Sequence, residues 1–167
     1  MGLVMQALAW VVFMALVGAW ISGRLERQYN PNQRVDTHYL DDGAREVVLK
    51  RSRSGHYLTA GAINGHPVVF MLDTGATGIA VPQDLARALD LEPGRQLTTR
   101  TANGLATAYA TRLDRVSVGD IALDNVPATI TPGLAMEEVL LGMSFLKHIE
   151  FTQRGDTLIL RQYPEPG

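Results

Sequence analysis

The longest apolar segment of the chain lies at its N-terminus. Residues 1–23 contain no charged side chain, and within them the run 3–22 is almost wholly apolar. Twenty helical residues that rise about 1.5 Å each span the roughly 30 Å of hydrocarbon in a bilayer. The pattern therefore predicts a transmembrane helix over residues 1–23 that anchors the chain in a lipid bilayer.

Two alternatives to an anchor are a cleaved signal peptide and a buried core helix. A signal peptide favours a basic start, a shorter apolar run and a small-residue cleavage site. Here the first basic residue is Arg24, and Gly18-Ala19-Trp20 is a poor cleavage context. The length of the run favours the anchor over both alternatives.

Polar residues without apolar periodicity follow over 24–43, and this composition predicts a flexible tether. About twenty flexible residues have a root-mean-square span of roughly 25 Å, so a domain at the end of this tether stays close to the bilayer. Residues 44–163 are predicted to form that domain, and residues 164–167 a short tail.

From residue 44 onwards, short apolar or alternating segments are separated by Gly, Asn, Asp and Pro about every ten residues, a spacing typical of an all-β domain. Asn64-Gly65 predicts a two-residue hairpin turn. Short helices are expected over 82–91, which starts with a proline, and over 144–148. Strands are expected over 46–51, 57–63, 67–72, 96–101, 106–118, 121–131, 139–141 and 149–161, the last folded back at 154–156.

The apolar run 68–72 ends in the turn Asp73-Thr74-Gly75, which presents one carboxylate at a strand end. Hydrolysis of a peptide bond by carboxylates needs one group that takes a proton from water and another that gives a proton to the substrate carbonyl. No second Asp-Thr-Gly or Asp-Ser-Gly occurs in the 167 residues. If Asp73 is catalytic, its partner must be the Asp73 of another chain, which predicts a homodimer with the site on its two-fold axis.

Two further features follow in the order that an aspartic protease half-site requires. Residues 101–104 form a turn between strand-like segments, and the apolar stretch 139–141 is ended by a glycine. With these features, residues 46–161 resemble a retropepsin-type (clan AA) aspartic protease, in particular the bacterial membrane-anchored members. The resemblance implies an all-β, retropepsin-like acid protease half-barrel with one or two short helices, preceded by the transmembrane helix.

The resemblance also implies a role for each matching residue. Asp73 shares and activates the lytic water with its dimer mate. Thr74 hydrogen-bonds across the two-fold axis, Gly75 allows close approach to substrate, and Thr77, after Ala76, hydrogen-bonds the carboxylate from behind. The other matching residues are Ala102, Asn103 and Gly104 in a flap, and Leu141 and Gly142 in the strand end that threads beneath the catalytic loop.

Other chemistries have little support in the sequence. Ser144 lacks the closing glycine of a nucleophile elbow and is predicted to cap a helix. The glycines near Asp73 carry no Gly-Lys-Ser/Thr phosphate signature, and the absence of cysteine removes disulfide and thiol chemistry. The four histidines are too dispersed for a local metal-binding pair: His38, His56, His66 and His148. We therefore expect neither a metal nor a cofactor.

Charge argues against nucleic acid as a partner. The formal net charge is −2, the isoelectric point is near 6.1, and the arginines form no basic run. Proteins that bind nucleic acid usually carry a basic patch or stripe. The expected partners are instead a second copy of the chain, a protein or peptide substrate near the membrane, and the lipid bilayer.

The expected function is that of a membrane-anchored aspartic endopeptidase. One alternative is a binding or scaffolding module of the same fold that does not turn over a substrate, and another is an interaction protein whose Asp-Thr-Gly is an ordinary turn.

The resemblance implies a single-pass protein of the bacterial inner membrane with a periplasmic domain. However, Arg24, Arg27 and Arg34 follow the apolar run, and the positive-inside tendency then favours the cytoplasmic face, so the orientation stays open.

Overall fold

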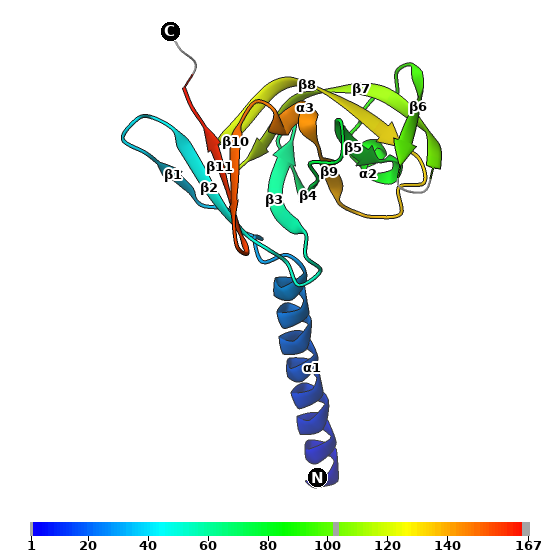
Figure 1. Ribbon diagram of the computed structural model, residues 1–167. Helices are drawn as coiled ribbons and strands as arrows, with labels where there is room; N and C mark the ends of the chain where they lie inside the picture. The colour runs from blue at the N-terminus through cyan, green and yellow to red at the C-terminus, as the bar shows by residue number, and fades with distance from the viewer. Residues whose placement is uncertain (1, 102–103, 165–167) are drawn as a thin grey trace.

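The computed structural model describes residues 2–101 and 104–164. A long N-terminal helix is attached to a β domain that carries two short helices (Figure 1). The helices are α1 (Gly2–Tyr29), α2 (Gln83–Ala88) and α3 (Met143–Leu146). The strands are β1 (Thr37–Tyr39), β2 (Arg45–Lys50), β3 (Tyr57–Ile63), β4 (His66–Leu72), β5 (Ile79–Pro82), β6 (Gln96–Thr101), β7 (Gly104–Val118), β8 (Ile121–Thr131), β9 (Val139–Leu141), β10 (Glu150–Arg154) and β11 (Thr157–Gln162).

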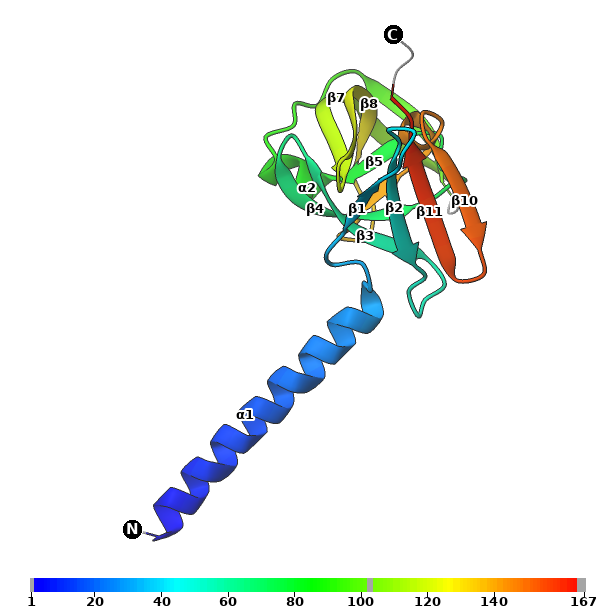
Figure 2. The ribbon, with the colours of Figure 1, turned by 90° about the vertical axis from the view of Figure 1, so that its left-hand side faces the viewer.

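The strands form two sheets. The smaller sheet is antiparallel with the order β1-β2-β11-β10, and Figure 2 shows these four strands side by side. The larger sheet has the order β3-β4-β9-β5-β8-β7-β6, in which β4 runs parallel to β9 and β5 parallel to β8. Because β4 ends at Leu72 and has β3 and β9 as neighbours, these three strands position Asp73.

One hydrophobic core is shared by both sheets and by α3. In β4, Val68 and Phe70 are buried, whereas Val69 is half-buried, which is the alternation expected of a strand with one fully packed face. Phe145 of α3 and Leu160 of β11 are fully buried in the same core. Burying each such side chain stabilises the fold by about 1.5–3 kcal/mol, so the strand that carries Asp73 is firmly held.

The predicted all-β architecture with short helices is confirmed. Strands β3 and β6 have the predicted bounds. The predicted hairpin joins β3 to β4, because Asn64 and Gly65 have φ values of 50° and 82°, as the two central residues of a type I′ turn require. The strands β1 and β5 are not predicted by the sequence pattern. Since Pro82 belongs to β5, the helix expected over 82–91 is shorter and begins at Gln83.

The structure differs from the flexible tether expected over 24–43. Helix α1 continues past the apolar run to Tyr29, because the Arg, Leu, Glu and Gln residues of this segment are good helix formers. Beyond the helix, Asn30 and Asn32 are buried, and β1 pairs with β2. The residues that follow α1 are therefore packed on the β domain.

Candidate active site

Asp73 is the first residue after β4. Its backbone N–H donates a hydrogen bond to the carbonyl of Leu141 at 3.2 Å, which extends the parallel pairing of β4 with β9 by one residue. Its side chain is half-buried. The backbone of Asp73 is thus fixed by the sheet, while its carboxylate remains within reach of solvent and of a bound chain.

The turn after Asp73 orients the carboxylate. Oδ1 of Asp73 accepts a hydrogen bond from the backbone N–H of Gly75 at 2.8 Å, and its backbone carbonyl accepts one from Ala76 at 3.2 Å. An aspartate that binds the N–H two residues further on mimics a backbone turn. A Cβ at Gly75 would lie 3.1 Å from the same Oδ1, which leaves little room for a side chain there. Thr74 and Gly75 are themselves exposed, so another chain can reach them.

Gly142 lies directly against the loop of residues 73–78. A Cβ at this position would lie 2.3 Å from the carbonyl oxygen of Gly78 and 2.6 Å from that of Ala76. The next residue, Met143, donates its N–H to the carbonyl of Ala76 at 2.9 Å. The start of α3 thereby holds the loop, and this close approach requires glycine.

Ser144 has a different role from the helix cap that its position predicts. Its Oγ accepts a hydrogen bond from the backbone N–H of Ile79 at 3.0 Å, while the residue that caps α3 is Gly142, without a side-chain bond. Ser144 thus joins α3 to the start of β5. Sequence reasoning misses this contact because Ile79 and Ser144 are far apart in the chain, and no pattern in the sequence predicts β5.

Thr77 is not placed behind the carboxylate as the resemblance implies. It is exposed, and in the part of the chain that the structure describes it makes no hydrogen bond to Asp73. The N–H of Gly75 occupies Oδ1 instead. Thr77 lines a different pocket, together with Gly78 and Ser144.

Two pockets are lined by residues of the loop 73–78. The smaller, of about 320 Å³, contains Asp73 and Thr74 in its wall. Its other lining residues are Tyr57, Leu72, Leu146, Phe151, Gln153 and Leu158. The Tyr57 hydroxyl is buried and has no hydrogen-bond partner among residues 2–101 and 104–164. Because this oxygen is already buried within the chain, a water molecule inside the domain is the partner that such a group usually finds.

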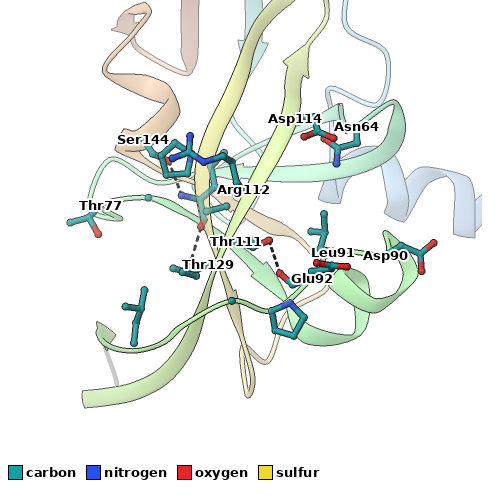
Figure 3. Close-up of a pocket in the computed structure, with 18 residues that line it drawn as sticks. Asn64, Thr77, Asp90, Leu91, Glu92, Thr111, Arg112, Asp114, Thr129 and Ser144 are labelled. Carbon is teal, nitrogen blue, oxygen red and sulfur yellow. Dashed lines mark hydrogen bonds between the residues drawn. The ribbon is translucent and has the colours of Figure 1, made fainter.

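The larger pocket, of about 940 Å³, is lined by the later residues of the loop, Thr77 and Gly78. Figure 3 shows Thr77 and Ser144 at one side of it and Leu91 and Glu92 at the other. Asp73 does not line this pocket. The smaller pocket is therefore the one that is placed for chemistry at the carboxylate.

The expected flap is only partly described. Ala102 and Asn103 lie outside the described residues, and Gly104 is the first residue of β7, with φ of +111°, in the region that favours glycine. Strands β6 and β7 form an antiparallel hairpin, with Gln96 opposite Tyr109 at one end of the ladder and Thr101 opposite Gly104 at the other.

No group of three or more His, Cys, Asp or Glu side chains lies together so as to hold a metal ion among the residues that the structure describes.

Comparison with known proteins identifies the family. Residues 59–148 match the model of the "gag-polyprotein putative aspartyl protease" family. A crystal structure of a retropepsin-like aspartic protease from Rickettsia conorii superposes with a TM-score of 0.59 at 28% sequence identity, covering 77% of this chain and 94% of the other. The matched segment includes the turn at Asp73, the hairpin of β6 and β7, and Gly142.

Two longer bacterial proteins are also similar. An uncharacterised protein from Sinorhizobium sp. is 37% identical over 124 residues, which are 72% of this chain and 53% of that protein. An uncharacterised protein from Rickettsia prowazekii is 28% identical over 163 residues, which are 93% of this chain and 70% of that protein. The chain thus spans about half the length of the first relative. Because the family model covers more than half of the sequence and the fold agrees, this chain belongs to the retropepsin-like aspartyl protease family.

Proposed function

We propose that the chain is a membrane-anchored aspartic endopeptidase whose reactive group is a pair of Asp73 carboxyls from two protomers. The observation that carries the proposal is the Asp73 carboxylate, fixed in its turn by Gly75 at the wall of a pocket. Within the described residues it is the one carboxylate that lines this pocket. Since peptide hydrolysis needs an acid and a base together, a second protomer has to supply the other carboxyl.

Two carboxyls about 3 Å apart do not both ionise, because their negative charges repel each other, so the pair retains one proton. The ionised Asp73 takes a proton from water while the water oxygen attacks the substrate carbonyl carbon. The protonated Asp73 gives its proton to the carbonyl oxygen, and a tetrahedral diol forms. In the collapse, one diol hydroxyl returns a proton to the pair, and the pair protonates the amine nitrogen as the C–N bond breaks. The pair ends with one proton, as it began.

Dimerisation is part of the proposal. Thr74 is exposed beside Asp73 and lines the same pocket. An exposed polar residue at this position suits a surface that a second protomer covers. Confinement of two chains to one membrane raises their effective concentration and favours the pairing.

Membrane anchoring by α1 is also a proposal. The helix contains a window with a mean hydropathy of 2.1, none of which is buried in the molecule, and the guanidinium of Arg24 lies 4.7 Å from the centre of the Trp20 ring. Trp and Arg are typical of the level where a helix leaves the hydrocarbon. The resemblance to exported members of the family supports our proposal of a periplasmic domain, whereas Arg24, Arg27 and Arg34 favour the cytoplasmic face. Protease digestion of a C-terminal tag on intact and permeabilised cells distinguishes the two orientations.

The substitution Asp73→Asn tests the catalytic role. We expect peptide cleavage to fall at least about a thousandfold, because the side chain keeps its shape but loses its acid and base function. Cleavage of a peptide library by the purified full chain, from acidic to neutral pH, measures the effect. Asp84→Asn, at an exposed carboxylate of α2, is the matched control and should cleave normally.

Undiminished cleavage by Asp73→Asn contradicts the proposal. Wild-type protein that is folded and binds peptides, yet cleaves none of them at any pH, identifies the chain as a binding module of the same fold.

A further inference from the structure

The C-terminal end of α1 is bound to the β domain by side-chain contacts. The hydroxyl of Tyr29 donates a short hydrogen bond to Oε1 of Glu138. This hydrogen bond, together with burial, raises the pKa of Tyr29 to about 12, so the hydroxyl stays protonated and remains a donor at neutral pH. The backbone carbonyl of Gln28 accepts a hydrogen bond from the backbone N–H of Arg53 at 3.4 Å, and Oε1 of Gln28 accepts one from the Arg53 guanidinium at 3.1 Å. The helix end is thus joined to two separate segments of the domain.

Asn32 adds a buried attachment immediately after the helix. Its Nδ2 donates to the carbonyls of Leu58 at 2.6 Å and Lys50 at 2.9 Å, and its Oδ1 accepts from the N–H of Lys50 at 2.8 Å. Its backbone carbonyl accepts from Ala60 at 3.0 Å. Asn32 is only 5% exposed, so water does not compete for these bonds. They fix the connection between helix and domain, where a flexible tether would leave it loose.

These attachments lie close to Asp73. Glu138 immediately precedes β9, the strand whose Leu141 accepts the N–H of Asp73. On the other side of β4, Leu58 is paired with Met71, two residues before Asp73. Both strands that flank β4 are therefore attached to the end of α1 near the catalytic loop. In Figures 1 and 2, α1 leaves the domain at the end where β3 begins.

The level of the membrane surface along α1 follows from its side chains. Trp20 and Arg24 form a cation–π pair, and such residues favour the interface between hydrocarbon and water. A helix rises about 1.5 Å per residue, so Tyr29 stands only about 7.5 Å beyond Arg24 along the axis. The point at which the domain is attached is thus itself near the lipid headgroups.

We propose that the docked end of α1 holds the Asp73 site at a fixed, short distance from the bilayer, so that its substrates are extended segments of other membrane-anchored polypeptides, cut within the first few residues outside the membrane. This inference rests on the proposed function and on anchoring by α1. An extended chain covers about 3.3 Å per residue, so a few residues beyond a transmembrane helix suffice to reach the site. A flexible tether would instead let the site reach bonds across a span of roughly 25 Å.

The test uses the full chain in liposomes with two transmembrane substrates. Both carry the same cleavable sequence. In the membrane-proximal substrate this sequence directly follows the transmembrane helix. In the raised substrate a helical Glu-Ala-Ala-Ala-Lys spacer of about 20 residues, roughly 30 Å long, separates the two. A soluble peptide of that sequence reports the basal activity. The matched enzyme variant carries a flexible Gly/Ser insert of about 20 residues between Glu26 and Arg27. Gln28 and Tyr29 then stay with the domain they are bound to, and the insert frees the domain from the membrane-spanning part of the helix without altering the catalytic loop.

We expect the wild type to cut the membrane-proximal substrate at least about tenfold faster than the raised one, and the insertion variant to cut both at similar rates, because its reach is then set by the flexible insert. Equal cutting of both substrates by the wild type overturns the inference, provided that the soluble peptide is cleaved. If the soluble peptide is not cleaved by wild type either, the proposed protease function fails, and the inference fails with it.

Discussion

Gly142 is a residue that limits the shape of the loop 73–78, because that loop leaves no room for a side chain at this position. In Gly142→Ala, the new Cβ would lie 2.3 Å from the carbonyl oxygen of Gly78 and 2.6 Å from that of Ala76, both of them backbone atoms that cannot rotate away. Overpacking of this kind costs about 1–3 kcal/mol. We expect the free energy of unfolding to fall by about 2 kcal/mol or more and peptide cleavage to fall with it, as measured by urea unfolding and an activity assay.

Gly78→Ala is the matched control, because its Cβ would approach Ser144 Oγ no closer than 3.6 Å, an ordinary contact. We expect it to change the free energy of unfolding by less than about 0.5 kcal/mol. Equal losses of stability in the two variants would show that the loop has room for a side chain at position 142, and would contradict the close contact of Gly142 with the loop.

Among single residues, the sequence predicts those parts of the site whose position is set by their immediate neighbours in the chain. Asp73 and Gly75 are visible because a strand ends in a glycine turn, and Gly142 because it ends an apolar stretch. Ser144 and Tyr57 are not visible as parts of the site, because their contacts depend on segments brought together only by the fold. The position implied for Thr77 also differs from the structure, in which Thr77 is exposed and Oδ1 of Asp73 accepts a hydrogen bond from the N–H of Gly75.

Among the elements, the segment between α1 and β1 is fixed mainly by Asn32. Asn32→Ala removes three side-chain hydrogen bonds to Lys50 and Leu58 and leaves backbone groups of both residues without these partners. An unsatisfied buried group costs about 1–3 kcal/mol. We expect the free energy of unfolding to fall by about 2–4 kcal/mol. Gln33→Ala, at an exposed neighbouring amide, is the control, and a similar loss in both variants contradicts the role of Asn32.

The same segment sets where a soluble domain has to begin. A chain that starts at Asn30 keeps Asn32 and the pairing of β1 with β2, whereas one that starts at Ala44 loses both. We expect the longer chain to be more stable by about 2 kcal/mol or more, because the bonds of Asn32 alone account for this much. Urea unfolding of the two chains measures the difference, and equal stability would place residues 30–43 outside the folded domain.

Helices, strands and turns are predicted correctly where residues close together in the sequence determine them. The strand over 57–63 and the Asn64-Gly65 turn reflect local backbone chemistry and are found as predicted. The strand β1 has three residues and is defined by its pairing with β2, so no periodicity reveals it. The end of α1 is not evident from the sequence because charged residues after an apolar run resemble a linker, although they also favour helix.

The whole molecule joins an apolar helix to a β domain, and in the proposed mechanism the Asp73 of each domain is one half of an acid and base pair. A monomer of this design has a prepared carboxylate and an accessible pocket beside it, but within the described part of the chain no second carboxyl lines that pocket. Activity should therefore depend on the square of the fraction of competent chains, since both protomers of each dimer contribute one carboxyl.

The most direct test of this claim is the activity of mixed dimers. Wild-type chain is allowed to exchange subunits with Asp73→Asn at a concentration where dimers form, and cleavage is measured per wild-type chain. With equal amounts, random pairing leaves about one quarter of the dimers with two aspartates, so activity per wild-type chain should fall to about half. With a large excess of the variant, it should approach zero. Constant activity per wild-type chain at every ratio would show that Asp73 acts without a partner and would contradict the shared pair.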